Sequence, residues 1–215
     1  DRRASREGRC RPMAEAEPPA AAPQPQPMTC VEALTEARIP EAAAIERDFL
    51  SSKHACCCIP LSMDVSPAAL RRRYTKHPEL MAVSAVALRG ETNGAIGFVK
   101  MALHGMPSDI HTPKPGECYI DAIAVLPEAR GTGAGKKMLE WCEETARARG
   151  ATFMSLGVLR GNPAIRLYER FGFEAKKEDL CSRWMANTFV CCLMGRPYGC
   201  CHPECGGFQM EKPLS

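Results

Sequence analysis

The pattern of apolar and polar positions changes period several times along the chain. Short apolar or alternating runs predict strands at 29–34, 80–88, 95–103, 117–125, 152–159, from 173 onward and at 208–211. Apolar residues three or four positions apart predict helices over 40–50, after 66, over 133–149 and after 162. The 80–88 and 95–103 runs are expected to form an antiparallel hairpin. Strands and helices thus share one patterned region that begins near residue 29.

Two of these helices carry clear start or stop signals. Ser66 is a good N-cap, and Pro67 follows in the first turn. Gly150 ends the 133–149 helix. The residues that this helix is expected to bury are Ala134, Met138, Leu139, Cys142 and Ala146.

Composition sets the domain organisation and limits the partners. Residues 1–28 are rich in Arg, Pro and Ala and predict a disordered tail, which leaves 29–215 as one domain. A net charge of +3 is too small to favour nucleic acid or an anionic membrane as a partner. Arg71–Arg73 is interpreted as a solvated helix face. No apolar run approaches the roughly 18 residues of a membrane span.

Thirteen cysteines raise the question of disulfides or metal. No signal peptide is visible, so free thiols in a cytoplasmic protein are expected. The alternative is that the tail is an Arg-rich remnant of an organelle transit peptide. A Cys-rich insertion is predicted at about 176–207, where packed thiols are favoured over a metal site because paired Cys-x-x-Cys spacing is missing. His104 and His111 are interpreted as surface loop residues, and no metal ligands are assigned.

The main candidate for chemistry is the glycine-rich bend Arg130–Gly135, which lies between the 117–125 strand and a long helix. Glycines let backbone N–H groups approach an anion, and the helix directs its positive end to the same place. A P-loop would need Ser or Thr after a single Lys, but Gly135 is followed by Lys136-Lys137. A Rossmann fingerprint would need a third glycine and an acid at the end of the next strand, and both are missing.

What does fit is Arg-x-x-Gly-x-Gly followed later by Asn-x-x-Ala-x-x-x-Tyr-x-x-x-Gly-Phe, a pair that resembles the GNAT superfamily of acyl-CoA-dependent N-acyltransferases. The matching residues are Arg130, Gly133 and Gly135, then Asn162, Ala164, Tyr168, Gly172 and Phe173. The likeness extends more loosely over about 29–177. It implies an α+β fold with a mixed α/β sheet of about six or seven strands, splayed between strands 4 and 5, with about four flanking helices.

The resemblance implies an N-acetyltransferase that uses acetyl-CoA as co-substrate and requires no metal. In the family, the bend binds the pyrophosphate and the end of the preceding strand faces the thioester. The implied cofactor-binding residues are Ile123, Ala124, Val125, Arg130, Gly131, Thr132, Gly133, Ala134, Gly135, Lys136 and Asn162. Asn162 also suits a helix N-cap whatever the function, and the two roles are compatible.

The motifs also imply two catalytic residues. Tyr168 is the candidate acid for the departing thiolate, since a phenol (pKa about 10) stays protonated where a thiol (about 8.5) ionises. Its alternative is a core tyrosine on an apolar stripe. Glu117 is the candidate base, thirteen residues before Arg130, where the histone-acetylating branch also places a glutamate. The alternatives to Glu117 are a surface carboxylate without a catalytic role and Asp121 as the base.

The acceptor amine remains open among a small molecule, a peptide N-terminus and a lysine. In the family the connection after the first helix, here with His54–Cys58, helps to form the acceptor site. Two other classes compete: a non-catalytic acyl-CoA-binding or sensing module, and a Cys-rich metal-binding interaction protein. A sensing module would have no need of Tyr168, so the complete second motif favours the enzyme.

Overall fold

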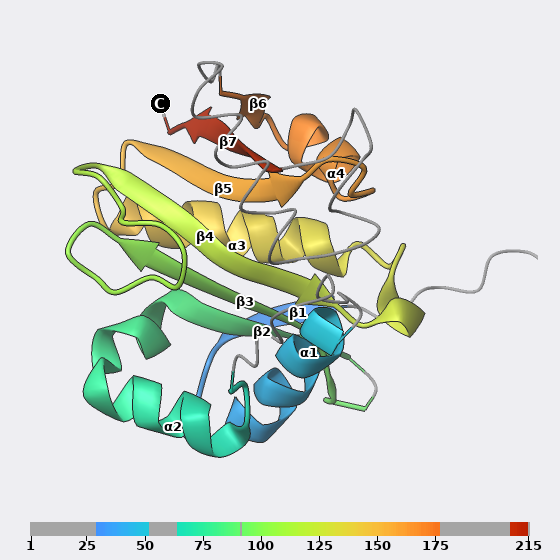
Figure 1. Cartoon of the computed structure of the whole chain (residues 1–215). Helices are drawn as coiled ribbons and strands as arrows, with labels where there is room; N and C mark the ends of the chain where they lie inside the picture. The colour runs from blue at the N-terminus through green and yellow to red at the C-terminus, as the bar shows by residue number, and fades with distance from the viewer. Residues whose placement is uncertain (1–28, 52–63, 91, 177–206, 215) are drawn as a thin grey trace, which may run out of the picture.

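The computed structural model describes residues 29–51, 64–90, 92–176 and 207–214. Within them, a single sheet has the strand order β1-β2-β3-β4-β5-β7-β6 (Figure 1). The strands are β1 (Thr29–Ala33), β2 (Ser84–Arg89), β3 (Ala95–Leu103), β4 (Glu117–Val125), β5 (Phe153–Leu159), β6 (Glu174–Ala175) and β7 (Gly207–Pro213).

All neighbouring strands are antiparallel except β4 and β5, which are parallel. These two strands pair only from Glu117–Ile120 to Phe153–Leu156. Beyond Ile120, β4 continues to Val125 beside β3 alone. The predicted mixed sheet with a splay between strands 4 and 5 is therefore confirmed.

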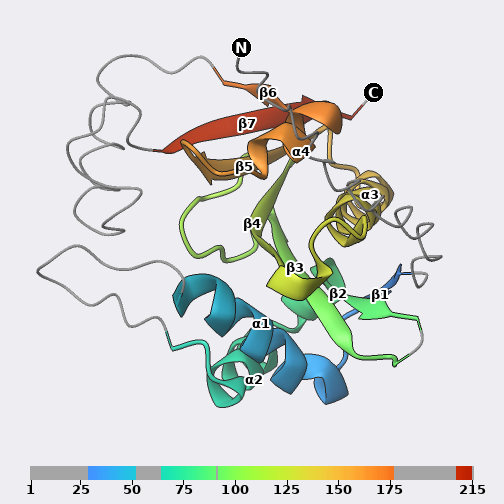
Figure 2. The same ribbon diagram turned by 90° about the vertical axis from the view of Figure 1, so that its right-hand side faces the viewer.

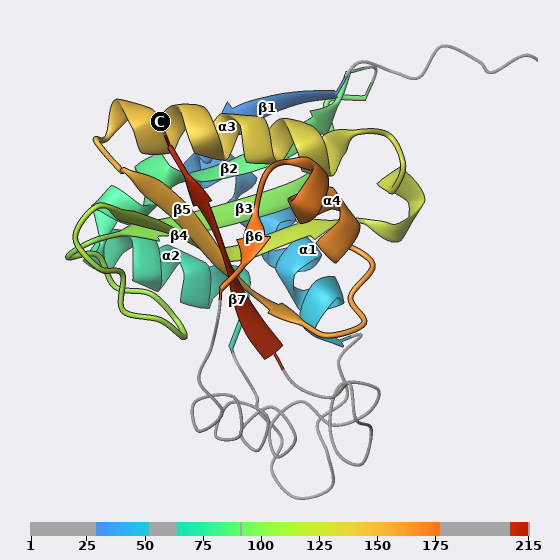
Figure 3. The same cartoon turned by 90° about the horizontal axis from the view of Figure 1, so that it is seen from above.

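Helices cover both faces of the sheet (Figures 2 and 3). One face, here called the α1/α2 face, is covered by α1 (Ile39–Ser51) and α2 (Pro67–Lys76). The opposite face is covered by α3 (Ala134–Ala148). The short α4 (Ile165–Arg170) follows β5 and lies near the splay. Three 3-10 turns complete the described elements: η1 (Glu36–Arg38), η2 (Pro78–Val83) and η3 (Pro127–Ala129).

The amphipathic pattern of α3 packs as expected. Its buried residues are Ala134, Met138, Leu139, Cys142 and Ala146. Cys118 of β4 faces the same layer, and its Sγ lies 3.5 Å from Met101 Sδ. Because side chains alternate along a strand, Glu117 and Tyr119 point to the α1/α2 face. A bulge opposite Lys100/Met101 makes Asp121 an extra residue in β4.

Several local predictions can be compared with the structure. Ser66 Oγ accepts a hydrogen bond from Ala69 N at 3.2 Å, so the predicted N-cap is confirmed. The prediction that the strand starts at residue 80 is wrong, because residues 80–83 belong to η2 and β2 begins at Ser84. Leu80 and Val83 are buried one 3-10 turn apart. A short buried turn and a buried strand both give a run of apolar residues, so the sequence pattern does not distinguish them.

Some predictions fall outside the described residues. These are the tail over 1–28, the His54–Cys58 connection and nearly all of the Cys-rich insertion. The cysteines that the structure does describe, Cys30, Cys118 and Cys142, are free thiols. Among the helices of the described ranges, none has the length and apolar character needed to cross a membrane.

Candidate active site

The bend between η3 and α3 has the backbone geometry of an anion site. Gly131 has φ +80° and Gly133 has φ +83°, both in the left-handed region that favours glycine. Thr132 Oγ1 donates to Ala129 O at 2.7 Å and fixes the loop between them. The first turn of α3 contains no acidic residue. Its first intrahelical bond runs from Lys137 N to Gly133 O, which leaves the preceding amide groups directed out of the helix end.

Three predicted parts of the site converge on Gly135. A Cβ placed on Gly135 would lie 3.1 Å from Leu167 Cδ2 of α4 and 3.9 Å from Val125 Cγ2 at the end of β4. The glycine-rich bend, the second motif and the end of β4 that does not pair with β5 are therefore neighbours in space. The residues Ile123–Val125, expected to face the thioester, pair with β3 on one side only.

Tyr168 lies on the inner side of α4. Tyr168 is 6% exposed. Its ring packs edge to face against the ring of Phe173, and the two ring centroids are 6.1 Å apart. Burial raises the pKa of Tyr168 to about 12, and the nearby Cys142 acts in the same direction. The phenol is therefore protonated at neutral pH, as a proton donor requires.

Asn162 performs a capping role, but not at the first residue of a helix. Its Oδ1 accepts from Ala164 N at 2.9 Å, and its backbone carbonyl accepts from Ile165 N at 3.1 Å. Because α4 begins at Ile165, Asn162 closes the turn that leads into the helix and is not its N-cap. The prediction is thus wrong by a few residues in position, since Pro163 and Ala164 belong to that turn.

Glu117 is the centre of a buried polar cluster on the α1/α2 face. Its side chain is 1% exposed. Oε2 accepts from Lys114 N at 2.8 Å, and Oε1 accepts from Ser155 Oγ. The Nε2 atoms of His111 and Gln209 lie 2.9 and 3.3 Å from the same Oε1. Burial acts to raise the pKa of Glu117, but these hydrogen bonds outweigh it and the pKa ends below its usual value.

Asp121 has different partners. Its Oδ1 accepts from Ser108 Oγ at 2.5 Å, and its Oδ2 lies 3.6 Å from Arg73 Nη2. Its side chain is also 1% exposed, and burial raises its pKa. Arg73 also forms an ion pair with Asp109. The interpretation of Arg73 as part of a solvated helix face is therefore wrong. Its partner Asp109 lies in the β3–β4 loop, far from Arg73 in the sequence but next to it in the fold.

The sequence did not indicate the partners of Glu117. The sequence predicts His111 to be a surface loop residue, but its ring contacts both Glu117 and Tyr119. The centroids of the His111 and Tyr119 rings are 4.6 Å apart. His104 does lie on the surface, and its Nδ1 is 2.9 Å from Pro113 O. Ser155 and Gln209 reach Glu117 from β5 and β7, so only the strand order could have revealed them.

Tyr119 of β4 extends its side chain to β5. A Cβ on Gly157 would lie 3.1 Å from the Tyr119 hydroxyl oxygen, so this hydroxyl lies against the backbone of β5. Burial, with Asp121 next in size, raises the pKa of Tyr119 to about 12. Within the described ranges, no group of three or more His, Cys, Asp or Glu side chains is placed to hold a metal ion.

Comparison with known proteins identifies the class. Residues 47–173 match the family model for the acetyltransferase (GNAT) family. This match spans more than half of the chain, which therefore belongs to the acetyltransferase (GNAT) family. The predicted superfamily and enzyme class are confirmed. A sequence search of curated proteins found no match.

Solved structures agree on the fold. A Salmonella typhimurium protein described as an acetyltransferase, with its cofactor acetyl-CoA, has a TM-score of 0.64 at 18% identity, covering 87% of this chain and 94% of its own. The ribosomal-protein-alanine N-acetyltransferase of Brucella melitensis has a TM-score of 0.59 at 21% identity, covering 86% and 99%. The Escherichia coli ribosomal-protein-S18-alanine N-acetyltransferase has 0.55 at 18%, covering 87% and 95%.

Proposed function

We propose that this protein transfers the acetyl group of acetyl-CoA to a primary amine by direct attack of the amine on the thioester. The observation that carries the proposal is the meeting of the bend, the end of β4 and α4 around Gly135. The bend offers backbone N–H groups to a pyrophosphate. Acetyl-CoA as the ligand is supported by the family and by the Salmonella typhimurium structure that contains it.

The unpaired edge of β4 would hold the pantetheine arm as an added strand is held. An N–H group near Val125 would then face the thioester oxygen, on which negative charge develops as the amine attacks. A hydrogen-bond donor placed there lowers the barrier by about 3 kcal/mol. As the carbon–sulfur bond breaks, Tyr168 would donate its phenolic proton to the CoA sulfur.

The amine must lose a proton before or during attack, and Glu117 is the proposed acceptor of that proton. Its lowered pKa keeps the carboxylate ionised at neutral pH, but its side chain is 1% exposed and surrounded by donors. His111 is the more accessible partner, with a side chain 24% exposed. We therefore propose that the proton reaches Glu117 through His111, whose other ring nitrogen faces away from the carboxylate.

The test is a transfer assay with purified protein, acetyl-CoA and a panel of alkylamines, peptides and lysine derivatives. Release of CoA thiol and the mass of the acetylated amine are both measured. Tyr168→Phe should lower kcat by about ten- to a thousandfold with little change in KM for acetyl-CoA, because the proton is needed only as the thiolate leaves.

Each alternative has its own outcome. A sensing module would bind acetyl-CoA but release no thiol with any amine. Equal kcat for Tyr168→Phe and the unmodified enzyme would leave Tyr168 as a core residue and return the acid role to solvent. Acetylation of one amine class alone would identify the acceptor.

A further inference from the structure

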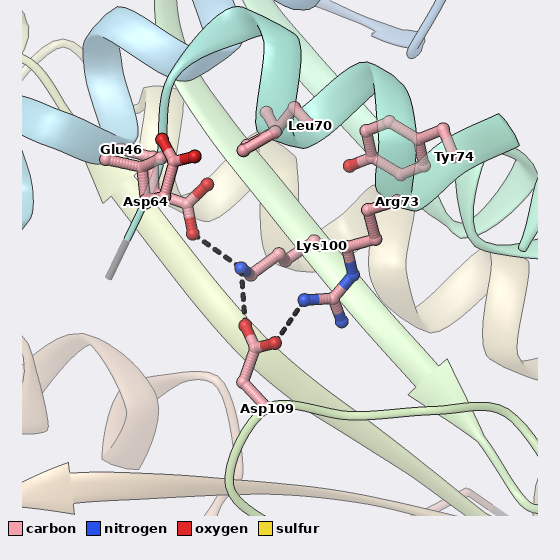
Figure 4. Close-up of a pocket in the computed structure, with 9 residues that line it drawn as sticks. Glu46, Asp64, Leu70, Arg73, Tyr74, Lys100 and Asp109 are labelled. Atoms are coloured by element: carbon pink, nitrogen blue, oxygen red, sulfur yellow. Dashed lines mark hydrogen bonds and ion pairs between the residues drawn. The ribbon is translucent and has the colours of Figure 1, made fainter. Parts of the chain in front are cut away.

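A second polar site lies on the α1/α2 face, apart from the bend. It is a cavity of about 240 Å³ between α1, α2, β3 and the β3–β4 loop (Figure 4). Its charged lining residues are Glu46, Asp64, Arg73, Lys100 and Asp109. Figure 4 shows Lys100 reaching between α1 and the loop that carries Asp109.

Most of these charges are already paired. Lys100 Nζ lies 2.5 Å from Glu46 Oε1 and 2.7 Å from Asp109 Oδ2. Burial acts to lower the pKa of Lys100, but the charges of Glu46 and Asp109 outweigh it and the pKa ends above its usual value. Lys100 is therefore a cation at neutral pH. Arg73 is held by Asp109 and Asp121.

One buried oxygen of a residue that lines the cavity has no hydrogen-bond partner. The Glu46 side chain is 4% exposed, and among the buried side-chain nitrogen and oxygen atoms of the described residues, its Oε2 alone lacks a hydrogen bond. A buried carboxylate oxygen without a donor is costly, and native structures rarely leave one so. Glu46 lines the cavity, but its Oε2 is out of contact with solvent, so a ligand that brings an N–H group would reach this oxygen after a small rotation of the carboxylate.

The charge of a ligand that would fit the cavity follows from the charged residues around it. Asp64 is largely exposed and forms an ion pair with Arg72, so it does not decide the charge. The paired network beside the cavity holds three carboxylates and two cations, which leaves an excess negative charge: Glu46, Asp109 and Asp121 with Lys100 and Arg73. An added anion would find no free cation among the lining residues, because Lys100 and Arg73 are paired with carboxylates. An ammonium group would satisfy both the charge and the free acceptor.

The cavity is also close to the proposed reaction site. Lys100 pairs directly with Ala122 across the β3–β4 ladder, one residue before Ile123. Asp121, in the bulge next to Ala122, shares Arg73 with the cavity wall. A molecule with one nitrogen at the β4 edge could therefore extend along the α1/α2 face toward Glu46.

We propose that Glu46 and this cavity bind a second ammonium group of the acceptor, at a distance from the amine that is acetylated. The acceptor class is then a diamine, a polyamine or another molecule with two cationic nitrogens. This inference rests on the proposed function, in which the acceptor is a primary amine.

The first experiment measures binding and needs no turnover. Linear diamines of about three to eight carbons are titrated into the CoA-bound protein by calorimetry. Glu46→Gln keeps the shape and a partner for Lys100 but removes the negative charge, so the Kd of the best diamine should rise at least about tenfold. The matched control is Glu41→Gln, also on α1, whose carboxylate contacts Arg38 and Ala95 N outside the cavity.

The second experiment compares each diamine with the monoamine of equal length in the transfer assay. The unmodified enzyme should prefer the diamine by at least about tenfold in kcat/KM, and Glu46→Gln should lose this preference with little change for the monoamine. If Glu46→Gln does not fold, Glu46→Met, which also removes the charge at similar size, serves in its place. Equal kcat/KM for the diamine and the monoamine in the unmodified enzyme would overturn the inference whichever variant is used.

Three results are distinguishable. Glu46-dependent diamine binding without acetylation would overturn the proposed function and support the site. Acetylation of monoamines and diamines at equal rates, unaffected by Glu46→Gln, would support the proposed function and overturn the site. Diamine binding that is undetectable, or the same in Glu46→Gln, would overturn the inference and leave the Glu46 oxygen to a bound water.

Discussion

Gly133 and Gly150 lie at opposite ends of α3 with nearly the same backbone conformation. Their φ values are +83° and +75°, and a Cβ on either would meet nothing within 4 Å. An L-residue would therefore be strained to a similar degree at each position, without a steric clash. The two glycines differ in what lies outside: Gly133 faces the proposed pyrophosphate, and Gly150 ends the helix far from it.

This pair gives a matched test of the anion site. Gly133→Ala should weaken acetyl-CoA binding about tenfold or more, because a methyl group would occupy the space of the phosphate and disfavour the left-handed turn. Gly150→Ala should lower thermal stability to a similar extent and leave the affinity unchanged. Calorimetric titration of both variants checks this, and an equal loss of affinity in both would point to general strain.

The strand β4 carries both candidate bases, Glu117 at its start and Asp121 in its bulge. Glu117 is bound to residues of β5, β7 and the β3–β4 loop, whereas Asp121 ties that loop and α2 to the strand. We propose Glu117 as the base because its partner His111 is 24% exposed and can pass a proton to it, and Asp121 as an anchor of the loop. The sequence alone does not show this difference, because the partners of both carboxylates come from other elements of the fold.

Their pH profiles should differ accordingly. Glu117→Gln cannot accept the amine proton, so kcat/KM should fall about tenfold or more at neutral pH. It should recover as the pH rises toward the alkylamine pKa near 10, because solution then supplies the neutral amine. Asp121→Asn, the matched variant, should show a smaller effect at neutral pH. A rescued defect in Asp121→Asn and a normal profile in Glu117→Gln would exchange the roles.

The sequence predicted the elements well and the contacts between them poorly. The strands, the face of α3 and the cap at Ser66 depend on local periodicity and hydrogen bonding, which neighbouring residues determine. The pairings of His111 with Glu117, Arg73 with Asp109 and Lys100 with Glu46 join residues from different elements. Local patterns do not contain such pairings, because each depends on strand order and loop path.

At the scale of the whole molecule, the sheet consists of two parts joined by the short β4–β5 ladder. One part is β1 to β4, and the other is β5, β7 and β6. The proposed acetyl-CoA site draws on both parts, with the bend and β4 on one side and α4 on the other. Bound cofactor would therefore contact both parts and oppose their separation.

Acetyl-CoA should accordingly raise the free energy of unfolding. At a concentration about 100 times Kd, the gain is about 2.7 kcal/mol, which corresponds to a Tm increase of roughly 5 to 10 °C for a chain of this size. Thermal unfolding at several concentrations checks the expected logarithmic dependence. CoA should give a similar shift, and Gly133→Ala a smaller one. A Tm that does not respond to either ligand would contradict the proposed site.

The position of β7 has a consequence for biosynthesis. Residues 207–213 are made after every other described strand, yet they lie between β5 and β6. During translation, at about 5–20 residues per second, the edge of β5 that pairs with β7 therefore stays unpaired while the intervening residues are added. An open strand edge is a template for other chains. A nascent or truncated chain that stops before residue 207 would keep that edge exposed, so chaperone dependence should concentrate in this late interval of synthesis.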